Sequence, residues 1–175
     1  MPMCLMMVGV PGSGKSTKIK ETIKDFPHFK VVSSDEYLEK VAKEQGKTYD
    51  EVHADNIDAA IKWMNSQIQT FIKNKENFIW DQTNLVKSSR EKKLRNLKSN
   101  GYEVNALTFE LPEEEVFHRL EKRVAEGGKS ISPKVIKNMM DSYERPSFDE
   151  GFDNIFLIDK NGNDVQLSKT NKLKP

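Results

Sequence analysis

Five short segments rich in apolar residues recur along the chain, with longer stretches of helical periodicity between them. The segments are Met3 to Val8, Phe29 to Ser33, Asn77 to Trp80, Tyr102 to Phe109 and Ile155 to Ile158. Short, nearly continuous apolar runs are typical of strands that are buried on both faces. Strands that alternate with helices form parallel sheets, because each parallel connection needs a long crossover. The pattern therefore predicts an α/β fold with a five-stranded, mainly parallel sheet.

Spacing and capping signals define the helices. The longest predicted helix covers about residues 55–73, and its apolar residues lie four, three, four, three and one positions apart. These residues are Ile57, Ile61, Met64, Ile68, Phe71 and Ile72. One such stripe is typical of a helix packed against a core. Pro112 and the pair Ser132–Pro133 open two later helices, and Asn161–Gly162 predicts a turn into a short returning strand at 165–167.

Composition narrows the class of protein. The chain has 175 residues, of which 36 % are hydrophobic and 31 % are charged, and no linker or repeat divides it. We expect one domain over residues 1–168 and a polar tail over residues 169–175. The longest apolar run, Met3 to Val10, is far shorter than the ~20 residues that span a membrane. The single cysteine, Cys4, excludes a disulfide framework and a cysteine-based zinc site. We expect a cytoplasmic protein without membrane contact.

Charge is nearly balanced overall but uneven locally. The net charge of +1 does not mark the chain as a nucleic-acid binder. The stretch from Lys87 to Lys98, however, contains six basic residues and one acidic residue, Glu91. Two interpretations stay open for this stretch: a solvated helix face, or a patch that faces a polyanion.

A phosphate-binding motif follows the first predicted strand. Residues 9–16 read Gly-Val-Pro-Gly-Ser-Gly-Lys-Ser and match G-x-x-x-x-G-K-[ST] in full, between an apolar strand and a helix. The glycines let backbone N–H groups turn toward phosphate oxygens, and the helix N-terminus adds its dipole. Lys15 is expected to reach the β- and γ-phosphates, and the Ser16 hydroxyl to coordinate Mg²⁺.

The motif predicts the binding of ATP with Mg²⁺ and a P-loop NTPase fold, a three-layer α/β/α sandwich with a helical lid. The residues expected to bind the nucleotide are Gly9, Pro11, Gly12, Ser13, Gly14, Lys15, Ser16 and Thr17.

Two aspartates lie at the ends of predicted strands. Asp35 comes just after the second strand and Asp81 ends the third. Ligands of parallel α/β sheets bind beyond the carboxyl ends of the strands, so both carboxylates are expected beside the phosphate loop. Phosphoryl transfer to an alcohol needs a group that accepts or orients the hydroxyl, and an acid near Mg²⁺ or its waters. The structural alternatives are a helix N-terminal acid for Asp35 and a cap or turn residue for Asp81.

Arg119 and Arg123 lie four residues apart, on one side of their predicted helix. Gly127–Gly128 then breaks the helix and predicts a hinge. This arrangement is typical of a lid that brings guanidinium groups onto a transferring phosphoryl group. The alternative is a pair of surface arginines bound to Glu115 and Glu126.

Several stretches together resemble the kinase domain of the polynucleotide 5′-hydroxyl kinases, a group similar to the zeta toxins. They are GVPGSGKST, SSDEY with Asp35, WDQTN from Trp80 to Asn84, the two spaced arginines, and residues 131–152 ending in SYERPSFDEGF. The resemblance spans about residues 3–158. Only the phosphate loop is a strong signal by itself, and the ordered set of motifs is more specific.

The resemblance implies a role for each matched residue. Asp35 would be the general base on the acceptor 5′-hydroxyl, Lys15 and Ser16 would serve the ATP phosphates and Mg²⁺, and Arg119 and Arg123 would stabilise the transferring phosphoryl group. A further set would organise the acceptor, with Asp81 also near the metal. This set is Asp81, Thr83, Asn84 and Arg90.

The chain departs from the family pattern in two places. Leu38 stands where the phage-type enzymes carry an arginine that holds the acceptor's phosphate, a residue that the animal type also lacks. The phosphatase motif D-x-D-G-T of bifunctional relatives is absent from the sequence, so no 3′-phosphatase activity is expected.

The sequence favours ATP-dependent phosphorylation of the 5′-hydroxyl of DNA, RNA or a nucleotide-like end. A small-molecule kinase for a nucleoside, nucleotide or nucleotide sugar would share the same motifs, because function depends on the acceptor site rather than the fold. A non-catalytic nucleotide-binding module is a third alternative, although it would need neither a base nor lid arginines.

Overall fold

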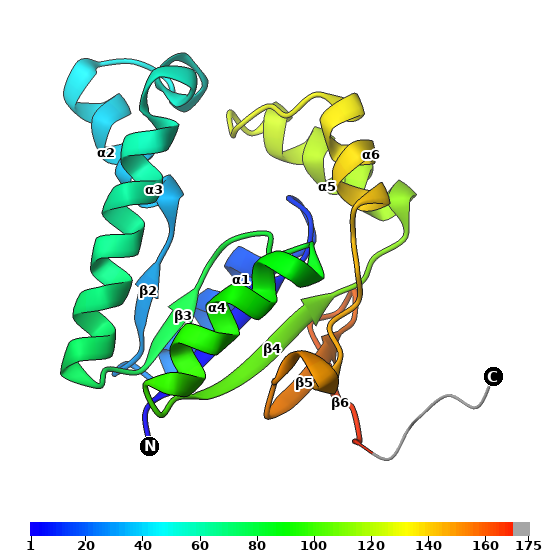
Figure 1. Cartoon of the computed structure of the whole chain (residues 1–175). Helices are drawn as coiled ribbons and strands as arrows, with labels where there is room; N and C mark the ends of the chain where they lie inside the picture. The colour runs from blue at the N-terminus through cyan, green and yellow to red at the C-terminus, as the bar shows by residue number, and fades with distance from the viewer. Residues whose placement is uncertain (170–175) are drawn as a thin grey trace.

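The computed structural model describes residues 1–169, in which a six-stranded sheet carries helices on both faces (Figure 1). The strands are β1 (Met3–Val8), β2 (Lys30–Val32), β3 (Phe78–Trp80), β4 (Glu103–Phe109), β5 (Asn154–Ile158) and β6 (Asp164–Gln166). The helices are α1 (Lys15–Asp25), α2 (Ser34–Gln45), α3 (Tyr49–Asn74), α4 (Lys87–Ser99), α5 (Glu113–Ala125), α6 (Pro133–Asp141) and the 3₁₀ turn η1 (Phe148–Glu150). Apart from Lys169, the predicted polar tail lies outside the described residues.

The strand order is β2-β3-β1-β4-β5-β6, and the first five strands of this order are parallel. The predicted parallel sheet is thus confirmed. β6 returns antiparallel to β5, with Phe156 opposite Gln166, as the Asn161–Gly162 turn predicted. The order places the carboxyl ends of β2, β3 and β1 side by side, so the loops that follow these strands can form one site.

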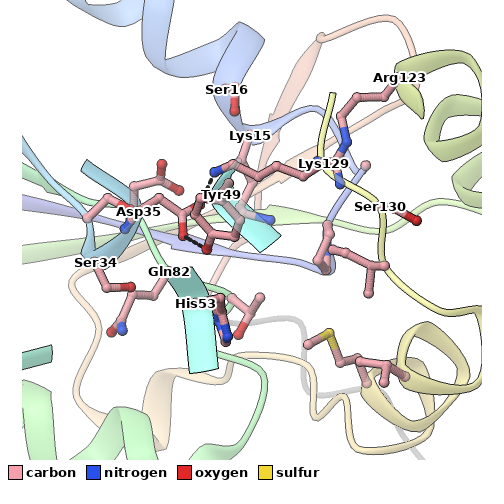
Figure 2. A pocket seen from close by; sticks show the side chains of 18 of the residues that line it. Lys15, Ser16, Ser34, Asp35, Tyr49, His53, Gln82, Arg123, Lys129 and Ser130 are labelled. Carbon is pink, nitrogen blue, oxygen red and sulfur yellow. Dashed lines mark hydrogen bonds and ion pairs between the residues drawn. The ribbon is translucent and has the colours of Figure 1, made fainter. Parts of the chain in front are cut away.

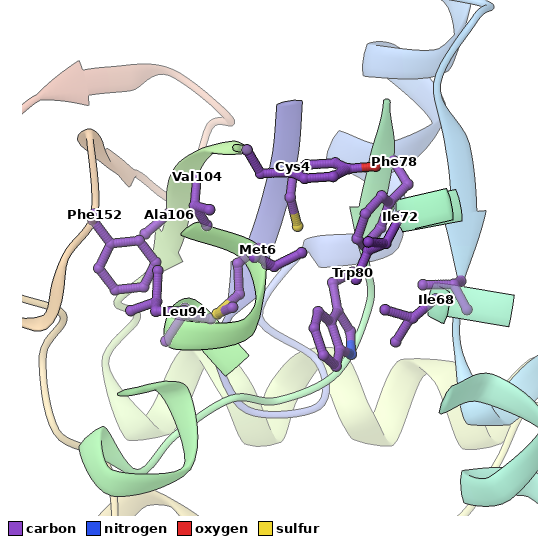
Figure 3. Packing of buried hydrophobic residues seen from close by; sticks show 14 of the residues in the cluster. Cys4, Met6, Ile68, Ile72, Phe78, Trp80, Leu94, Val104, Ala106 and Phe152 are labelled. Carbon is purple, nitrogen blue, oxygen red and sulfur yellow. The ribbon is translucent and has the colours of Figure 1, made fainter. Parts of the chain in front are cut away.

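Helices cover the two faces of the sheet with separate hydrophobic cores. On one face, buried residues of α3 and α4 pack on alternate residues of the central strands (Figure 3). The core of this face includes Met6, Phe78 and Trp80, each no more than 4 % exposed. On the other face, Ile19 of α1 packs against Met7. This alternation explains why β1 and β3 are apolar throughout, because both faces are covered.

The N-terminus of α3 differs from the prediction. The helix begins at Tyr49, several residues before the apolar stripe, because Thr48 and Glu51 form a capping box. The Thr48 hydroxyl accepts a bond from the Glu51 N–H, and the Glu51 carboxylate accepts one from the Thr48 N–H at 2.7 Å. Within the stripe, Ile61 is 38 % exposed, so its predicted burial is wrong. The buried face runs instead through Ala60 and Met64.

A second helical unit, which we call the lid segment (residues 113–141), comprises α5, α6 and the loop between them. Its buried residues Val116, Leu120 and Ile136 pack against Val10 of the phosphate loop. The Ser132 hydroxyl caps α6 by accepting a bond from Val135 N–H, as the Ser–Pro pair predicted. In Figure 1 the lid segment and the N-terminal end of α3 stand on opposite sides of the upper end of the sheet.

Four of the six basic residues of α4 bind other parts of the chain. Lys87 pairs with Asp149 at 2.6 Å, and Lys98 pairs with Asp153 at 2.6 Å. The Lys93 ammonium donates to amide oxygens of two residues in the loop after β3. Neither interpretation of this stretch included these contacts, but Lys92 and Arg95 are exposed to solvent as a solvated face predicts, and the polyanion patch stays a prediction. The helix anchors the segment that precedes β5.

No helix in the part of the chain that the structure describes is both long enough and apolar enough to cross a membrane.

Candidate functional site

The phosphate loop (residues 9–16) leaves β1 and enters α1 with little room for side chains. Gly12 has φ +80° and Gly14, the N-cap of α1, has φ +103°, values that favour glycine. A Cβ atom at Gly12 would lie 2.9 Å from Leu120 Cγ, and one at Gly14 would lie 3.3 Å from an Arg119 guanidinium nitrogen. The bare backbone forms the cradle that the motif predicted, with the lid segment packed directly against it.

The Lys15 side chain folds back over its own loop. Its ammonium donates to the carbonyl oxygens of Gly9 and Val10, at 2.7 and 2.9 Å. Burial lowers the pKa of Lys15 to about 8, although the negative charges of Asp81 and Asp35 act in the opposite direction. The ammonium thus lies in a poorly solvated position that a phosphate oxygen would stabilise.

A cavity of about 1000 Å³ extends from the phosphate loop to the space between α3 and the lid segment (Figure 2). It is large enough to enclose a ligand much larger than a phosphate group. Most residues predicted to act at the site line it together, namely Pro11, Gly12, Gly14, Lys15, Ser16, Thr17, Asp35, Asp81, Thr83, Arg119 and Arg123. Gly9 and the buried Ser13 stand behind this surface, where the Gly9 N–H donates to the Thr83 carbonyl at 2.9 Å.

Asp35 lies in the first turn of α2, and two side chains hold its carboxylate. The Ser33 hydroxyl caps this helix by accepting a bond from the Asp35 N–H at 3.1 Å. The Tyr49 hydroxyl donates to Oδ1 at 2.6 Å, and the Lys129 ammonium donates to Oδ2 at 3.0 Å. Burial alone would raise the pKa of Asp35, but these two partners outweigh it and hold the pKa below its usual value. The carboxylate is therefore ionised at neutral pH.

The sequence prediction missed these two partners of Asp35. Tyr49 follows the threonine of the Thr48–Glu51 capping box, a signal that could have placed it at a helix start. Lys129 follows the Gly127–Gly128 hinge and so could have been assigned to the lid segment. No local pattern links either residue to Asp35, because Lys129 is 94 residues away along the chain. His53 and Gln82 also line the cavity and carry no recognisable signal.

Asp81 follows β3 and lines the cavity between Asp35 and the phosphate loop. Burial raises its pKa above the usual value, and the charge of Asp35 raises it further, while the Lys15 ammonium opposes both. Such a carboxylate favours a nearby cation. Ser16 and Asp81 offer the oxygen donors that Mg²⁺ prefers, and this ion takes few ligands from a protein. In the described part of the chain, no cluster of three or more His, Cys, Asp or Glu residues could hold a metal.

The two lid arginines have different surroundings. Arg119 donates to Glu115 at 2.6 Å and to the Lys160 carbonyl at 2.9 Å. The bond to Glu115 agrees with the predicted alternative in which the arginines pair with glutamates of the same region. Arg123 has its Nε and one terminal nitrogen buried with no hydrogen-bond partner among the described residues. A buried guanidinium without a partner is unfavourable. An anion in the cavity, such as the terminal phosphate of a nucleotide, would supply one.

The structure does not bring Arg90 to the cavity, where a contact with the substrate was expected. Its guanidinium is 0 % exposed and forms two bonds with Glu150, at 2.8 and 2.7 Å. Its remaining nitrogen donates to the carbonyl oxygens of Asn84 and Leu85. Arg90 therefore fixes the loop after β3 from behind and reaches no ligand.

Asn84 also has a structural position rather than the predicted acceptor contact. It is 5 % exposed and adopts φ +47°, a conformation that asparagine tolerates. Its amide donates to the Met7 carbonyl at 2.7 Å and accepts from Lys93. Asn84 thus joins the loop after β3 to the end of β1, which is needed to hold Asp81 and Thr83 in the cavity wall.

Comparison with known proteins identifies the family. The profile of the AAA_33 family, described as an AAA domain, matches residues 4–146. The chain belongs to this family. With the phosphate loop and the parallel sheet already described, the match makes the protein a kinase-like P-loop domain, and such domains typically use a nucleotide and Mg²⁺.

Solved structures of similar fold include several kinases. A protein of Chloroflexus aurantiacus that is assigned as a kinase matches with a TM-score of 0.71, 16 % identity and coverage of 90 % of this chain and 88 % of that chain. A gluconokinase from Sinorhizobium meliloti matches with a TM-score of 0.56, 19 % identity and coverage of 90 % and 82 %. At these identities the likeness shows the fold of a P-loop kinase and not its substrate.

A chain of the Pnkp1/Rnl/Hen1 RNA repair complex matches with a TM-score of 0.60 and 25 % identity, over 81 % of this chain but only 43 % of that chain. The kinase-like domain described here therefore corresponds to less than half of that protein.

Proposed function

We propose that this kinase-like domain transfers the terminal phosphoryl group of ATP to a hydroxyl group, and that its acceptor is the 5′-hydroxyl of a polynucleotide. One observation carries the proposal. The ionised carboxylate of Asp35, the buried Lys15 ammonium and the unpartnered guanidinium of Arg123 all line one cavity at the phosphate loop. A nucleotide-binding module needs the phosphate loop but not an oriented carboxylate beyond it.

The residues divide the reaction between two halves of the cavity. Backbone N–H groups of the phosphate loop and Lys15 bind the ATP phosphates, while Arg123 supports negative charge on the moving phosphoryl group. Asp35 accepts a hydrogen bond from the acceptor hydroxyl and then takes the proton of that hydroxyl. A bond forms between the acceptor oxygen and the γ-phosphorus as the bond from that phosphorus to the bridging oxygen breaks. The products are ADP, a phosphomonoester and a proton that Asp35 returns to water.

The pKa of Asp35 suits an orienting role. A carboxylate whose pKa lies below its usual value is a weak base at neutral pH. In a loose phosphoryl-transfer transition state the acceptor hydroxyl needs little deprotonation before the new bond forms. Asp35 therefore directs the hydroxyl oxygen toward phosphorus and receives the proton late in the step.

The residues present also fit a magnesium ion. The Ser16 hydroxyl and the Asp81 carboxylate, the latter directly or through water, would hold it beside the phosphate loop. When bound, Mg²⁺ supplies positive charge that neutralises the β- and γ-phosphates. The raised pKa of Asp81 means that such a cation would strengthen its ionised form.

Two lines of support favour a polynucleotide acceptor. The motifs of the polynucleotide 5′-hydroxyl kinases occur here in the same order. The chain from the RNA repair complex matches at higher identity than the gluconokinase does, 25 % against 19 %.

One observation favours a small-molecule acceptor as the second candidate. The basic helix α4 would be the natural contact for a nucleic-acid backbone, but four of its six basic residues are engaged elsewhere. Lys87, Arg90 and Lys98 pair with carboxylates, and Lys93 binds amide oxygens. This helix would offer a polynucleotide backbone the two exposed residues Lys92 and Arg95.

The test is transfer of label from γ-labelled ATP to a panel of acceptors with Mg²⁺. The panel contains 5′-hydroxyl DNA and RNA oligomers, nucleosides, nucleoside 3′- and 5′-monophosphates and a nucleotide sugar. We expect label on the oligomers, lost in Lys15→Ala and reduced at least a hundredfold in Asp35→Asn, which should still bind ATP. Asp55→Asn, an exposed aspartate of α3, is the matched control and should keep full activity.

The other outcomes separate the alternatives. Label on a nucleoside, nucleotide or sugar nucleotide alone would assign a small-molecule kinase. Intact ATP binding without transfer to any acceptor would favour a non-catalytic module. Transfer by Asp35→Asn within a few-fold of the wild type would show that the carboxylate is not the group that receives the hydroxyl.

A further inference from the structure

The lysine on the lid segment makes three contacts at the acceptor half of the cavity. The Lys129 ammonium lies 3.0 Å from Asp35 Oδ2, 3.0 Å from Glu39 Oε1 and 3.9 Å from the centre of the Tyr49 ring. Its side chain is 24 % exposed. Figure 2 shows Lys129 and Tyr49 close to the carboxylate of Asp35. The ammonium therefore bridges α2 and α3 from the opposite wall of the cavity.

Tyr49 and Lys129 bind the Asp35 carboxylate without occupying all of its hydrogen-bond positions. Tyr49 donates to one carboxylate oxygen and Lys129 to the other. A carboxylate accepts about four hydrogen bonds, so each oxygen keeps a position for a further donor. An acceptor hydroxyl can then bind Asp35 while both partners stay in place. Two fixed donors also restrict rotation of the carboxylate, which a single partner would not.

The same segment carries the arginines. Arg119 and Arg123 belong to α5, and Lys129 follows in the loop to α6, after Gly127 with φ +81°. One packed unit therefore presents guanidinium groups to the phosphate half of the cavity and an ammonium to the acceptor half. Movement of this unit would change both halves together.

We propose that Lys129 is a positioning residue which, from the lid segment, fixes the carboxylate of Asp35, so that the acceptor hydroxyl is oriented only when the lid segment covers the cavity. This inference rests on the role given to Asp35 under the proposed function. It adds that closure of the cavity by the lid segment sets the orientation of the Asp35 carboxylate.

The charges around Asp35 agree with this role. The groups that face it are Tyr49 and His53 of α3, Lys129 of the lid segment, Glu39 of its own helix, and Asp81 and Lys15 at the strand ends. Burial raises the pKa of Asp35, whereas Tyr49, Lys129 and His53 lower it. Without Lys129 the effect of burial would weigh more, and the pKa would rise.

The first arm of the test needs no acceptor. The carboxyl carbon of Asp35 is titrated by NMR in protein labelled at aspartate, with Asp35→Asn used to assign the signal. We expect a pKa below the usual aspartate value in the wild type and a higher pKa in Lys129→Met. Lys129→Arg should keep the low value. Lys134→Met changes an exposed lysine of α6 and serves as the matched control. An Asp35 pKa that is the same in Lys129→Met and the wild type would overturn the proposal.

The second arm measures transfer to a 5′-hydroxyl DNA oligomer from pH 5 to pH 8. Because the ionised carboxylate is the active form, a higher pKa moves the acidic limb of kcat to higher pH in Lys129→Met. At neutral pH we expect kcat to fall by about ten- to a hundredfold from lost orientation, while ATP affinity stays within about twofold. Tyr49→Phe should move the limb in the same direction, and Lys129→Arg should restore most of the loss.

Other outcomes overturn the proposal in distinct ways. Higher activity of Lys129→Met would identify Lys129 as a blocking group that occupies the acceptor position. A higher KM with unchanged kcat would make it a binding contact for the acceptor. A wild-type protein that labels no oligomer would refute the proposed function, and the NMR arm would still decide whether Lys129 sets the state of Asp35.

Discussion

Two arginines bury guanidinium nitrogens in opposite surroundings. Arg90 has a carboxylate and two carbonyl oxygens as partners, all inside the protein. Arg123 has two buried nitrogens without any partner among the described residues. A buried charge with all its hydrogen bonds made inside the protein has a structural role. A buried charge without partners destabilises the structure unless a ligand binds it. The two residues should therefore respond differently to mutation.

Removal of the acid that pairs with Arg90 should destabilise the fold strongly. Glu150→Gln leaves a fully buried guanidinium without its counter-charge, and we expect the free energy of unfolding to fall by about 3 kcal/mol or more. Urea denaturation measures this loss. Lys98→Met breaks the partly exposed pair with Asp153 and should lower the stability by no more than about 1 kcal/mol. Equal losses in the two variants would contradict the assignment of Arg90 to the core.

Replacement of Arg123 should separate stability from activity. Arg123→Leu removes an unpaired buried charge, so the ligand-free protein should be at least as stable as the wild type. Phosphoryl transfer should fall by about a thousandfold or more, as for an arginine that supports the transition state. Thermal unfolding without nucleotide and transfer from labelled ATP are the two measurements. A variant that is less stable but fully active would show that Arg123 is structural.

Sequence reasoning succeeded at residues whose neighbours are local and failed where partners are distant. Lys15 and Asp35 lie in the predicted cavity wall because a strand end and its loop position them. Arg90 looked like part of an exposed basic stretch, and its partner Glu150 lies 60 residues further on. Nothing in the local pattern marks one arginine of that helix as buried.

At the scale of elements, a close contact joins the phosphate loop to α5. Gly12 combines a positive φ with a site where a Cβ atom would lie 2.9 Å from Leu120 Cγ, a buried atom of the lid segment. The loop and the lid segment therefore pack directly against each other at Gly12. A larger side chain at Gly12 should displace both of them.

A methyl group at Gly12 should weaken nucleotide binding by displacing α5 from the loop. For Gly12→Ala we expect a loss of about 1–3 kcal/mol in stability from the strained φ, and an ATP Kd at least about tenfold higher. Gly46→Ala is the matched control, because Gly46 has φ +63° and no atom within 4 Å of a Cβ. It should lose stability but bind ATP normally. Unchanged ATP affinity in Gly12→Ala would show that loop and helix move independently.

The elements themselves were largely predictable, and their boundaries less so. Apolar runs located the strands, and the phosphate-loop motif fixed the first connection. The start of α3 was missed because its first turns are mostly polar, with Val52 as an isolated buried apolar residue beside the cap. Tyr49, which holds Asp35, lies in that missed turn.

At the scale of the whole molecule, positive and negative charges are nearly balanced. The net charge is +1, and acids just before β5 pair with three basic residues of α4, while Lys92 and Arg95 of that helix are exposed. A polyanion would then meet little net positive charge on the protein as a whole. The salt dependence of acceptor binding reports this directly.

Binding of an oligomer acceptor should depend only weakly on salt. Between 50 and 200 mM KCl we expect its KM to rise less than about tenfold, as one or two phosphate contacts with a single strand would give. A protein that makes six or more such contacts would lose about 300-fold or more over that range. A nucleoside monophosphate measured in parallel corrects for effects on ATP. A steep dependence would show that a basic surface outside the cavity binds the acceptor.

The returning strand β6 has a practical consequence for protein engineering. β5 runs toward the end of the sheet that bears the cavity, and β6 reverses this direction, so that the Leu167 N–H bonds Ile155 at the start of β5. β1 begins at this same end of the sheet. In Figure 1 the start of β1 and the end of β6 both lie away from the lid segment. A reporter, an affinity handle or a second catalytic domain joined to either end would therefore leave the entrance to the cavity free.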